Sequence, residues 1–240
     1  MNNKLFELYS SKWDELCSAM IPILENKDLE IKPTNPLLLS VDNEDDFRNA
    51  DFRVMFFGQE TKDWSAGIEP QYRLNPQHDD DIGFILNIYK EFYNSGYCYI
   101  HHGGQFWNGV NRFRKMLGEK YPDKKICYVW NNIVKIGIFE DKGCPPNYIY
   151  DVERKYFSVV KEEINIIKPN VILFLTGPNY DNKISDTFGQ VTYSALSPFS
   201  KRELAKISIP DVDVAFRTYH PGYLWRNNIE RFFDAIVDEI

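Results

Sequence analysis

The segment DVDVAFRTYHPGYLWR, residues 211–226, decides how the chain folds, because an apolar strand in it runs directly into a His-Pro turn. Apolar and polar residues alternate from 212 to 216, which predicts a half-buried strand. Pro221 ends this strand, since proline lacks a backbone donor and fixes φ. His220 is therefore expected at the carboxyl end of a strand, where open α/β sheets bind their ligands. A histidine before a proline is also a common hydrogen-bonded turn residue, so other segments must decide its role.

A helix is expected to close the chain after this strand. Gly222 allows a backbone direction that is closed to other residues, and Asn227 or Asn228 can then cap the helix. The apolar positions that follow recur at helical spacing. They are Ile229, Phe232, Phe233, Ile236, Val237 and Ile240.

Three further short apolar runs are predicted to be strands. Runs of this kind are typical of parallel strands that are covered on both faces. They occupy residues 52–57, 125–130 and 171–175. Segments with helical spacing separate them, at 82–93, at 106–117 and from Asp151 to Pro169. Strands that alternate with helices imply right-handed crossovers, so the sequence predicts an α/β fold with a parallel sheet of four strands and helices on both faces.

The remaining segments fit a single domain over residues 1–240, because no Gly/Ser-rich or Pro-rich linker divides the chain. Residues 4–24 have the pattern of an amphipathic helix. Residues 25–50 are polar and interrupted by prolines, which predicts a loop or an irregular cover. Residues 1–50 are therefore expected to form a helical extension that packs on the domain. Residues 190–196 are expected to be a strand or one arm of a hairpin.

The charge of the chain bears on its partners. A formal net charge of −7 disfavours binding to nucleic acid, which depends on neutralising phosphates. The charge is unevenly distributed, however, since residues 112–125 carry six basic against two acidic residues. A bipolar surface is therefore possible, although charge runs are usually solvated faces.

The apolar runs are far too short to span a bilayer, and the first residues lack the pattern of a signal peptide. We therefore expect a soluble, cytoplasmic protein with no membrane partner.

The adjacent His101 and His102 do not predict zinc, which needs three or four converging ligands. No metal and no cofactor are expected. The four cysteines, which have no C-x-x-C pair, predict neither a disulfide framework nor a metal cage; they are Cys17, Cys98, Cys127 and Cys144.

Two other predicted strands end in polar residues. Gly58 permits a sharp exit from the run at 52–57, and Glu60 places a carboxylate just beyond the sheet. Asn132 follows the run at 125–130, and its amide has the donor and the acceptor that suit the edge of a nucleobase. A turn glutamate and an Asx turn are the alternatives. The long connection over 62–82, which contains Trp64, is of the kind that often covers a site.

Four segments taken together resemble the uracil-DNA glycosylase superfamily. They are FFGQE at 56–60, NNIVK at 131–135, EINIIKPNVILFLTG at 163–177 and TYHPGYLWR at 218–226. The later segments are most similar to the branch that is common in thermophilic bacteria and archaea. The resemblance implies a three-layer α/β/α sandwich with a central four-stranded parallel sheet, which holds a flipped-out nucleotide at its carboxyl edge.

The resemblance also implies roles for individual residues. Glu60 matches the catalytic carboxylate that activates water, and His220 matches the catalytic histidine that supports the leaving base. The residues that it places on the substrate are Gly58, Gln59, Trp64, Asn132, Tyr219 and Gly222. The residues that it places on the DNA backbone are Ser197, Lys201 and Arg226.

The sequence departs from the family pattern in two places. Thr61 and Lys62 stand where the family usually has Pro and then Tyr or Gly, so the base that is recognised stays open. The thermophile-type branch holds an iron-sulfur cluster with four cysteines, but Ile136 follows Lys135 here and the chain has no ligand set, so no cluster is expected.

The expected function is therefore that of a monomeric, monofunctional DNA glycosylase, whose partner is DNA containing uracil or another modified base. Two alternatives stay open. One is a catalytically silent module that binds a nucleobase or nucleotide. The other is a hydrolase of small nucleosides or nucleotides, which suits the acidic composition because it needs no extended phosphate track.

Overall fold

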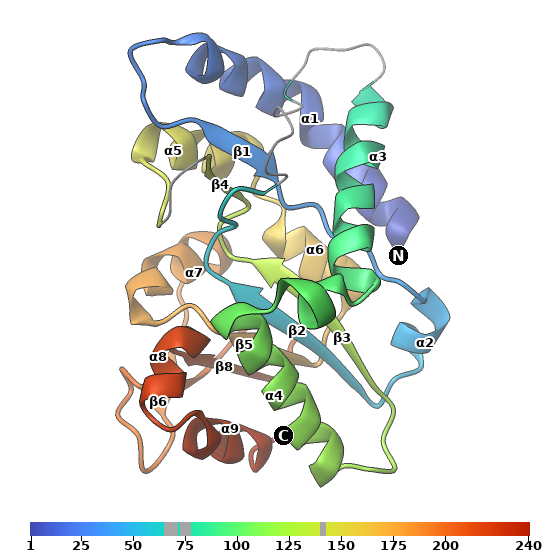
Figure 1. The fold of residues 1–240 in the computed structure, drawn as a ribbon, viewed down its shortest axis with the longest axis vertical. Coiled ribbons are helices and arrows are strands. Elements are labelled where there is room, and N and C mark those ends of the chain that lie inside the picture. Colours follow the sequence, from blue (N-terminus) through green and yellow to red (C-terminus); the bar gives the residue numbers. More distant parts are fainter. Residues whose placement is uncertain (65–71, 73–77, 140–142) are drawn as a thin grey trace.

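A mixed sheet of six strands lies at the centre of the molecule, in the order β3-β2-β5-β8-β7-β6 (Figure 1). The computed structural model describes residues 1–64, 72, 78–139 and 143–240, without the side chains of residues 78–80. Most of the predicted long connection over 62–82 lies outside these residues. The α/β class that the sequence predicts is confirmed.

The predicted apolar runs all form strands of this sheet. They are β2 (Phe52–Gly58), β3 (Ile126–Asn132), β5 (Val171–Phe174) and β8 (Val214–Thr218). Each of them pairs in parallel with its neighbour. The sheet continues through β7 (Leu204–Ile207) and β6 (Tyr193–Ala195), which pair antiparallel. A wholly parallel sheet of four strands is therefore not confirmed. The sequence signal for β6 is weak because the strand is only three residues long and is mostly exposed.

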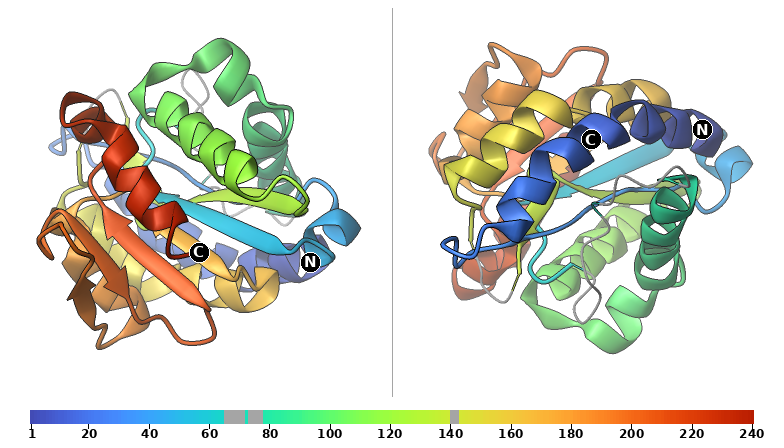
Figure 2. Two further views of the ribbon diagram at one scale, coloured as in Figure 1. Left: turned by 90° about the horizontal axis from the view of Figure 1, so that it is seen from below. Right: turned by 90° about the horizontal axis from the view of Figure 1, so that it is seen from above.

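Helices cover both faces of the sheet. Successive side chains of residues 54–57 in β2 point to opposite faces and are apolar, so both faces must be buried. Val54 and Phe56 pack in one apolar cluster, whereas Met55 and Phe57 pack in another. The first cluster contains residues of α4 (Gly104–Lys120), α8 (Pro221–Arg226) and α9 (Ile229–Val237). The second contains residues of α1 (Asn2–Glu25), α3 (His78–Tyr89), α5 (Asn147–Tyr156), α6 (Val160–Ile167) and α7 (Asp181–Phe188). Figure 2 shows helices on the two sides of the sheet.

The first fifty residues contain more regular structure than predicted. After α1, the strand β1 (Pro33–Pro36) pairs antiparallel with β4 (Ile136–Ile138), and the short helix α2 (Glu44–Arg48) is capped by Asn43. Prolines begin and end β1, which hides it from a search for strand patterns. One face of α1 is buried in the same cluster as the sheet residues. No helix in the described part of the chain is both long and apolar enough to cross a membrane.

Two predicted helices differ from the observed ones. The single helix expected from Asp151 to Pro169 is two helices, α5 and α6, with Asp151 inside the first. The break occurs where Phe157 is fully buried and stacks on Tyr9, with ring centroids 6.1 Å apart. At the end of the chain, α8 begins directly at Pro221, before the asparagines that were expected to start the last helix. Asn228 takes the cap position of α9, but its side chain makes no capping hydrogen bond.

We expect Phe56→Ala to lower the free energy of unfolding by about 3–5 kcal/mol, because it opens a cavity at the centre of the sheet. Phe56 is fully buried and its ring contacts Phe113 and Tyr128. Phe84→Ala on α3 is the matched control, because Phe84 is 39% exposed; we expect it to change stability by about 0.5 kcal/mol or less. Urea unfolding checks both values. Equal losses in the two variants would contradict the assigned core.

Candidate functional site

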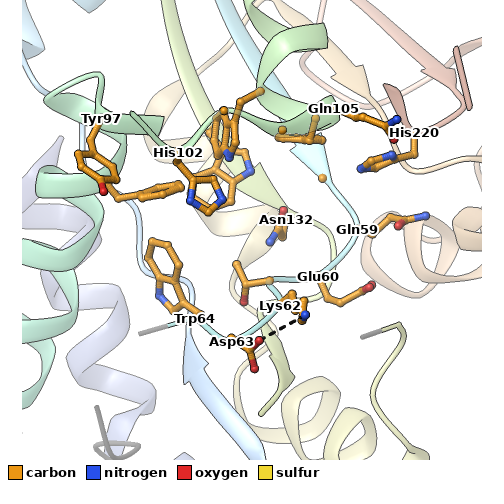
Figure 3. A pocket seen from close by; sticks show the side chains of 18 of the residues that line it. Gln59, Glu60, Lys62, Asp63, Trp64, Tyr97, His102, Gln105, Asn132 and His220 are labelled. Atoms are coloured by element: carbon orange, nitrogen blue, oxygen red, sulfur yellow. Dashed lines mark ion pairs between the residues drawn. The ribbon is translucent and has the colours of Figure 1, made fainter. Parts of the chain in front are cut away.

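A cavity of about 800 Å³ opens at the carboxyl ends of β2 and β3. Gly58, Gln59 and Glu60 line it where β2 ends, Asn132 lines it where β3 ends, and His220 lines it just after β8. Figure 3 shows these polar side chains around one hollow. The sheet thus brings together residues that are far apart in the sequence.

The ends of β2 and β3 are joined beyond the last pair of the ladder. Gly58 lies opposite Asn132 in the parallel register. The N–H of Ile133 donates to the carbonyl of Gly58 at 3.1 Å, and that of Val134 donates to the carbonyl of Gln59 at 3.0 Å. A Cβ atom added to Gly58 would lie 2.3 Å from Oδ1 of Asn132. A side chain at position 58 would therefore displace the Asn132 amide.

A buried polar network contacts the backbone of Asn132. Asn131 Oδ1 accepts from the N–H of Asn132 at 2.9 Å and from Nζ of Lys135 at 2.6 Å. Asn131 Nδ2 donates to Glu163 Oε2 at 2.8 Å, and Lys135 Nζ donates to Glu163 Oε1 at 2.8 Å. The hydroxyl of Tyr9 also donates to Glu163 at 2.7 Å. The network thus connects α1 and α6 to the end of β3.

The charges in this network are fully buried. The side chains of Lys135 and Glu163 have no exposed surface. Burial lowers the pKa of Lys135, and the neighbouring Glu163 carboxylate opposes that change. The N–H groups of Lys135 and Ile136 donate to the Glu153 carboxylate. Burial raises the pKa of Glu153 to about 7, and these two hydrogen bonds oppose that rise. The loop after β3 is therefore held from two sides by carboxyl groups of α5 and α6.

His220 is held in one orientation and one tautomer. It caps α8, and its Nδ1 accepts from the N–H of Gly222 at 3.0 Å. A neutral ring that accepts through Nδ1 carries its proton on Nε2. Burial, and then the charge of Arg226, lower the pKa of His220 and favour this neutral form. Phe106 stacks on the ring with centroids 5.6 Å apart. The histidine therefore supplies a neutral N–H donor at the cavity.

Glu60 and Gln59 are anchored to the segment that follows β5. Gln59 Nε2 donates to the carbonyl of Thr176 at 2.7 Å. The carboxylate of Glu60 accepts a hydrogen bond from the hydroxyl of Tyr180. Burial raises the pKa of Glu60, and the hydrogen bond from Tyr180 opposes that rise. The two polar residues after Gly58 thus depend on β5 for their positions.

The other side of the cavity is aromatic. Trp64, Phe92, Trp107 and Trp130 pack edge to face, with centroids 4.9 Å apart for Trp107 and Trp130. Figure 3 shows Trp64, Tyr97 and His102 across the cavity from His220. Two π-helical segments form part of this wall, η1 (Lys90–Asn94) and η2 (Cys98–His102). Such segments are rare and are frequently found at functional sites.

The structure divides the predicted site residues into two groups. Those that line the cavity are Gly58, Gln59, Glu60, Trp64, Asn132 and His220. The predicted substrate contacts of Tyr219 and Gly222 are not supported by the cavity. Tyr219 stacks on Tyr223 with centroids 4.1 Å apart, and Gly222 is buried where an added Cβ would lie 2.4 Å from Gln105 Oε1. Three exposed residues, predicted on the DNA backbone, also lie outside the cavity; they are Ser197, Lys201 and Arg226.

Several residues of the site were not predicted from the sequence to belong to it, and His102 was considered there only as a zinc ligand. They are Phe92, Tyr97, His102, Gln105, Phe106, Trp107, Trp130 and Tyr180. A strand-end signal was available for Trp130, which directly precedes the asparagines of β3. Gln105 follows two glycines with positive φ, Gly103 and Gly104. Nothing in its local sequence marks Tyr180, because the contact with Glu60 forms only when β5 and β2 pair.

Among the residues that the structure describes, no three His, Cys, Asp or Glu side chains gather as metal ligands. The cysteines are free thiols on α1, η2, β3 and the segment before α5. They do not fit the iron-sulfur cluster of the thermophile-type branch.

Comparison with known proteins does not identify the chain. No protein-family model matches it, and no curated protein is significantly similar to it.

We expect Glu163→Leu to lower the free energy of unfolding by about 3–5 kcal/mol, because it leaves the Lys135 cation buried without its partner. The double variant Lys135→Met/Glu163→Leu should recover most of that loss, since a buried ion pair is often replaceable by apolar residues. Urea unfolding of the two variants measures this difference. A double variant that is less stable than the single one would show that the pair is not the central feature of the network.

We expect Gly58→Ala to fold but to displace the Asn132 side chain, because the new Cβ would overlap Oδ1. The side-chain amide signals of Asn132, assigned by Asn132→Asp, should shift in ¹⁵N-edited NMR spectra. The matched control is Gly118→Ala on α4, where an added Cβ meets nothing within 4 Å. It should leave those signals unchanged and stabilise the helix by about 0.5–1 kcal/mol. Unchanged Asn132 signals in Gly58→Ala would contradict the close approach.

Proposed function

We propose that the chain is a monofunctional DNA glycosylase of the uracil-DNA glycosylase type, acting on uracil or another modified base flipped out of DNA. The proposal rests on one observation: Glu60, Asn132 and His220 line the same cavity at the carboxyl edge of the sheet. We assign the fold accordingly to the α/β/α sandwich of that superfamily. In this assignment β3, β2, β5 and β8 are its four parallel strands, and β6 and β7 are an addition.

The cavity has the features that recognition of a base requires. Its volume of about 800 Å³ lies in the range of small-molecule sites, so it can hold a nucleobase with its sugar. The Asn132 amide offers a donor and an acceptor to the edge of the base. The wall formed by Trp64, Trp107 and Trp130 offers apolar surface to the heterocycle. The base must leave the duplex to enter, which is how enzymes reach bases that are otherwise stacked.

The polar residues suit hydrolysis of the bond between C1′ of the sugar and the base nitrogen. As this bond breaks, its electron pair leaves with the base and the sugar becomes electron-poor. The Nε2–H of His220 donates to an oxygen of the base and stabilises the developing anion. The Glu60 carboxylate stabilises the cationic sugar and accepts a proton from the water that attacks C1′. That proton is then available to the departing base.

A specific observation favours hydrolysis of small nucleosides or nucleotides as a second candidate. The basic residues of 112–125, which were a possible DNA-binding surface, are mostly neutralised by acidic partners. The pairs are Arg112–Glu230, Lys115–Glu119, Lys120–Asp238, Lys124–Asp51 and Lys125–Asp46. With a net charge of −7, little basic surface remains on this segment for a phosphate backbone.

We expect base release from single- or double-stranded oligonucleotides that carry uracil or one of a panel of modified bases. Alkaline strand scission at low salt reveals the abasic product. Glu60→Gln and His220→Ala should each lower the rate by about 10²–10³, because each removes a group that stabilises charge in the transition state. Glu119→Gln, on the exposed face of α4, is the control for the Glu60 change and should have no effect.

The same assay separates the alternatives. Activity on DNA should fall steeply as salt rises, whereas hydrolysis of a neutral nucleoside should barely respond. Base or nucleotide binding that survives Glu60→Gln, without release from the unmodified protein, would indicate the silent module. Folded protein that releases no base from any oligonucleotide would count against the glycosylase.

A further inference from the structure

Tyr180, on the segment that follows β5, holds the Glu60 carboxylate. This tyrosine ends η3 (Pro178–Tyr180), which lies between β5 and α7, and it is 8% exposed. Its hydroxyl donates to Oε2 of Glu60. Within the described part of the chain, this is the hydrogen bond that reaches the carboxylate.

The residues on either side of η3 contact β8, the strand that precedes His220. Gly177, at φ 76°, turns the chain after β5, and its N–H donates to the carbonyl of Thr218 at 2.9 Å. On the other side of Tyr180, Asp181 accepts from the buried guanidinium of Arg217 at 2.9 and 3.2 Å. Both sequence neighbours of η3 are thus tied to β8, which fixes the backbone from which the Tyr180 side chain reaches Glu60.

We infer that Tyr180 is a positioning residue, which holds the Glu60 carboxylate ionised and aimed at the sugar; this inference rests on the proposed function. The physical need is clear, because an apolar cavity disfavours a charged carboxylate. A hydroxyl donor favours the charged form. The hydrogen bond is already formed in the structure, so it can stabilise the carboxylate without a conformational change.

Tyr180 keeps its proton throughout the reaction. Burial first, and then the neighbouring Glu60 carboxylate, raise the pKa of its hydroxyl well above the ordinary value. In the proposed step the water forms a bond to C1′ and gives its proton to Glu60, while the base leaves with the electron pair of the broken bond. Tyr180 contributes only its hydrogen bond, so it is not itself a catalytic residue.

Other titratable groups surround Glu60. They are Lys62 and Asp63 on its own segment, Cys144 before α5, Tyr180 on η3, and His102 and His220 around the cavity. Burial raises the pKa of the Cys144 thiol, which favours its neutral form. Lys62 is paired with Asp63 at 3.6 Å. Among the residues that the structure describes, the hydrogen bond from Tyr180 is therefore the direct contact that can shift the pKa of Glu60.

The test does not require activity. Glutamate labelled with ¹³C at Cδ reports the titration of Glu60, with its signal assigned by Glu60→Gln. Tyr180→Phe keeps the ring and removes the donor, so the midpoint of Glu60 should rise by about one pH unit. Tyr150→Phe is the matched control, because its buried hydroxyl bonds to Asp186 instead, and it should leave the midpoint unchanged. An unmoved midpoint in folded Tyr180→Phe overturns the inference.

Base release supplies the second readout. Activity that needs ionised Glu60 is lost as the pH falls through its pKa. The acidic limb of the kcat/KM profile should therefore move to higher pH in Tyr180→Phe, by the same amount as the titration. A moved titration with an unmoved limb overturns the positioning role. A moved titration with no base release from any oligonucleotide overturns the proposed function and leaves the contact between Tyr180 and Glu60 established.

Discussion

The buried pair of Lys135 and Glu163 is the interaction on which the arrangement of the site depends. Two charges without exposed surface must be paired and fully hydrogen-bonded, or one of them would be lost. Asn131 and Tyr9 supply further hydrogen bonds, so the pair connects α1 and α6 to the end of β3. The backbone of Asn132 is linked to this network, because its N–H donates to Oδ1 of Asn131. Gly58 then leaves room for the Asn132 side chain.

The proposed chemistry needs a neutral His220 and an ionised Glu60, although both side chains are largely buried. Burial favours the neutral form of each, which suits His220 as an N–H donor and opposes Glu60 as a carboxylate. The two side chains have different hydrogen-bond partners. His220 receives a backbone N–H on Nδ1, which leaves Nε2 as the donor, whereas Glu60 receives a hydroxyl from Tyr180. The aromatic wall around Trp130 keeps this side of the cavity apolar.

The sequence predicts the framework well because continuous apolar runs and polar strand ends are local signals. They locate β2, β3, β5 and β8, and parallel pairing then gathers Glu60, Asn132 and His220 at one edge. Other features depend on contacts that no local pattern records. The break at Phe157 follows from its packing on Tyr9, and Tyr219 stacks on Tyr223 and is not among the residues that line the cavity. The prolines of β1 remove the strand pattern from its sequence. The ion pairs of residues 112–125 could not be predicted, because partners such as Glu230 and Asp238 are far away in the sequence.

We propose that one nucleobase lies between Asn132, His220 and the aromatic wall, with Glu60 beside its sugar. The most direct measurement is a crystal structure of the Glu60→Gln variant with a single-stranded oligonucleotide that contains deoxyuridine. We expect an extruded nucleotide in the cavity, with Nε2 of His220 and the Asn132 amide within hydrogen-bond distance of the base. A nucleotide bound elsewhere on the surface, or a cavity that stays empty beside bound DNA, would contradict it.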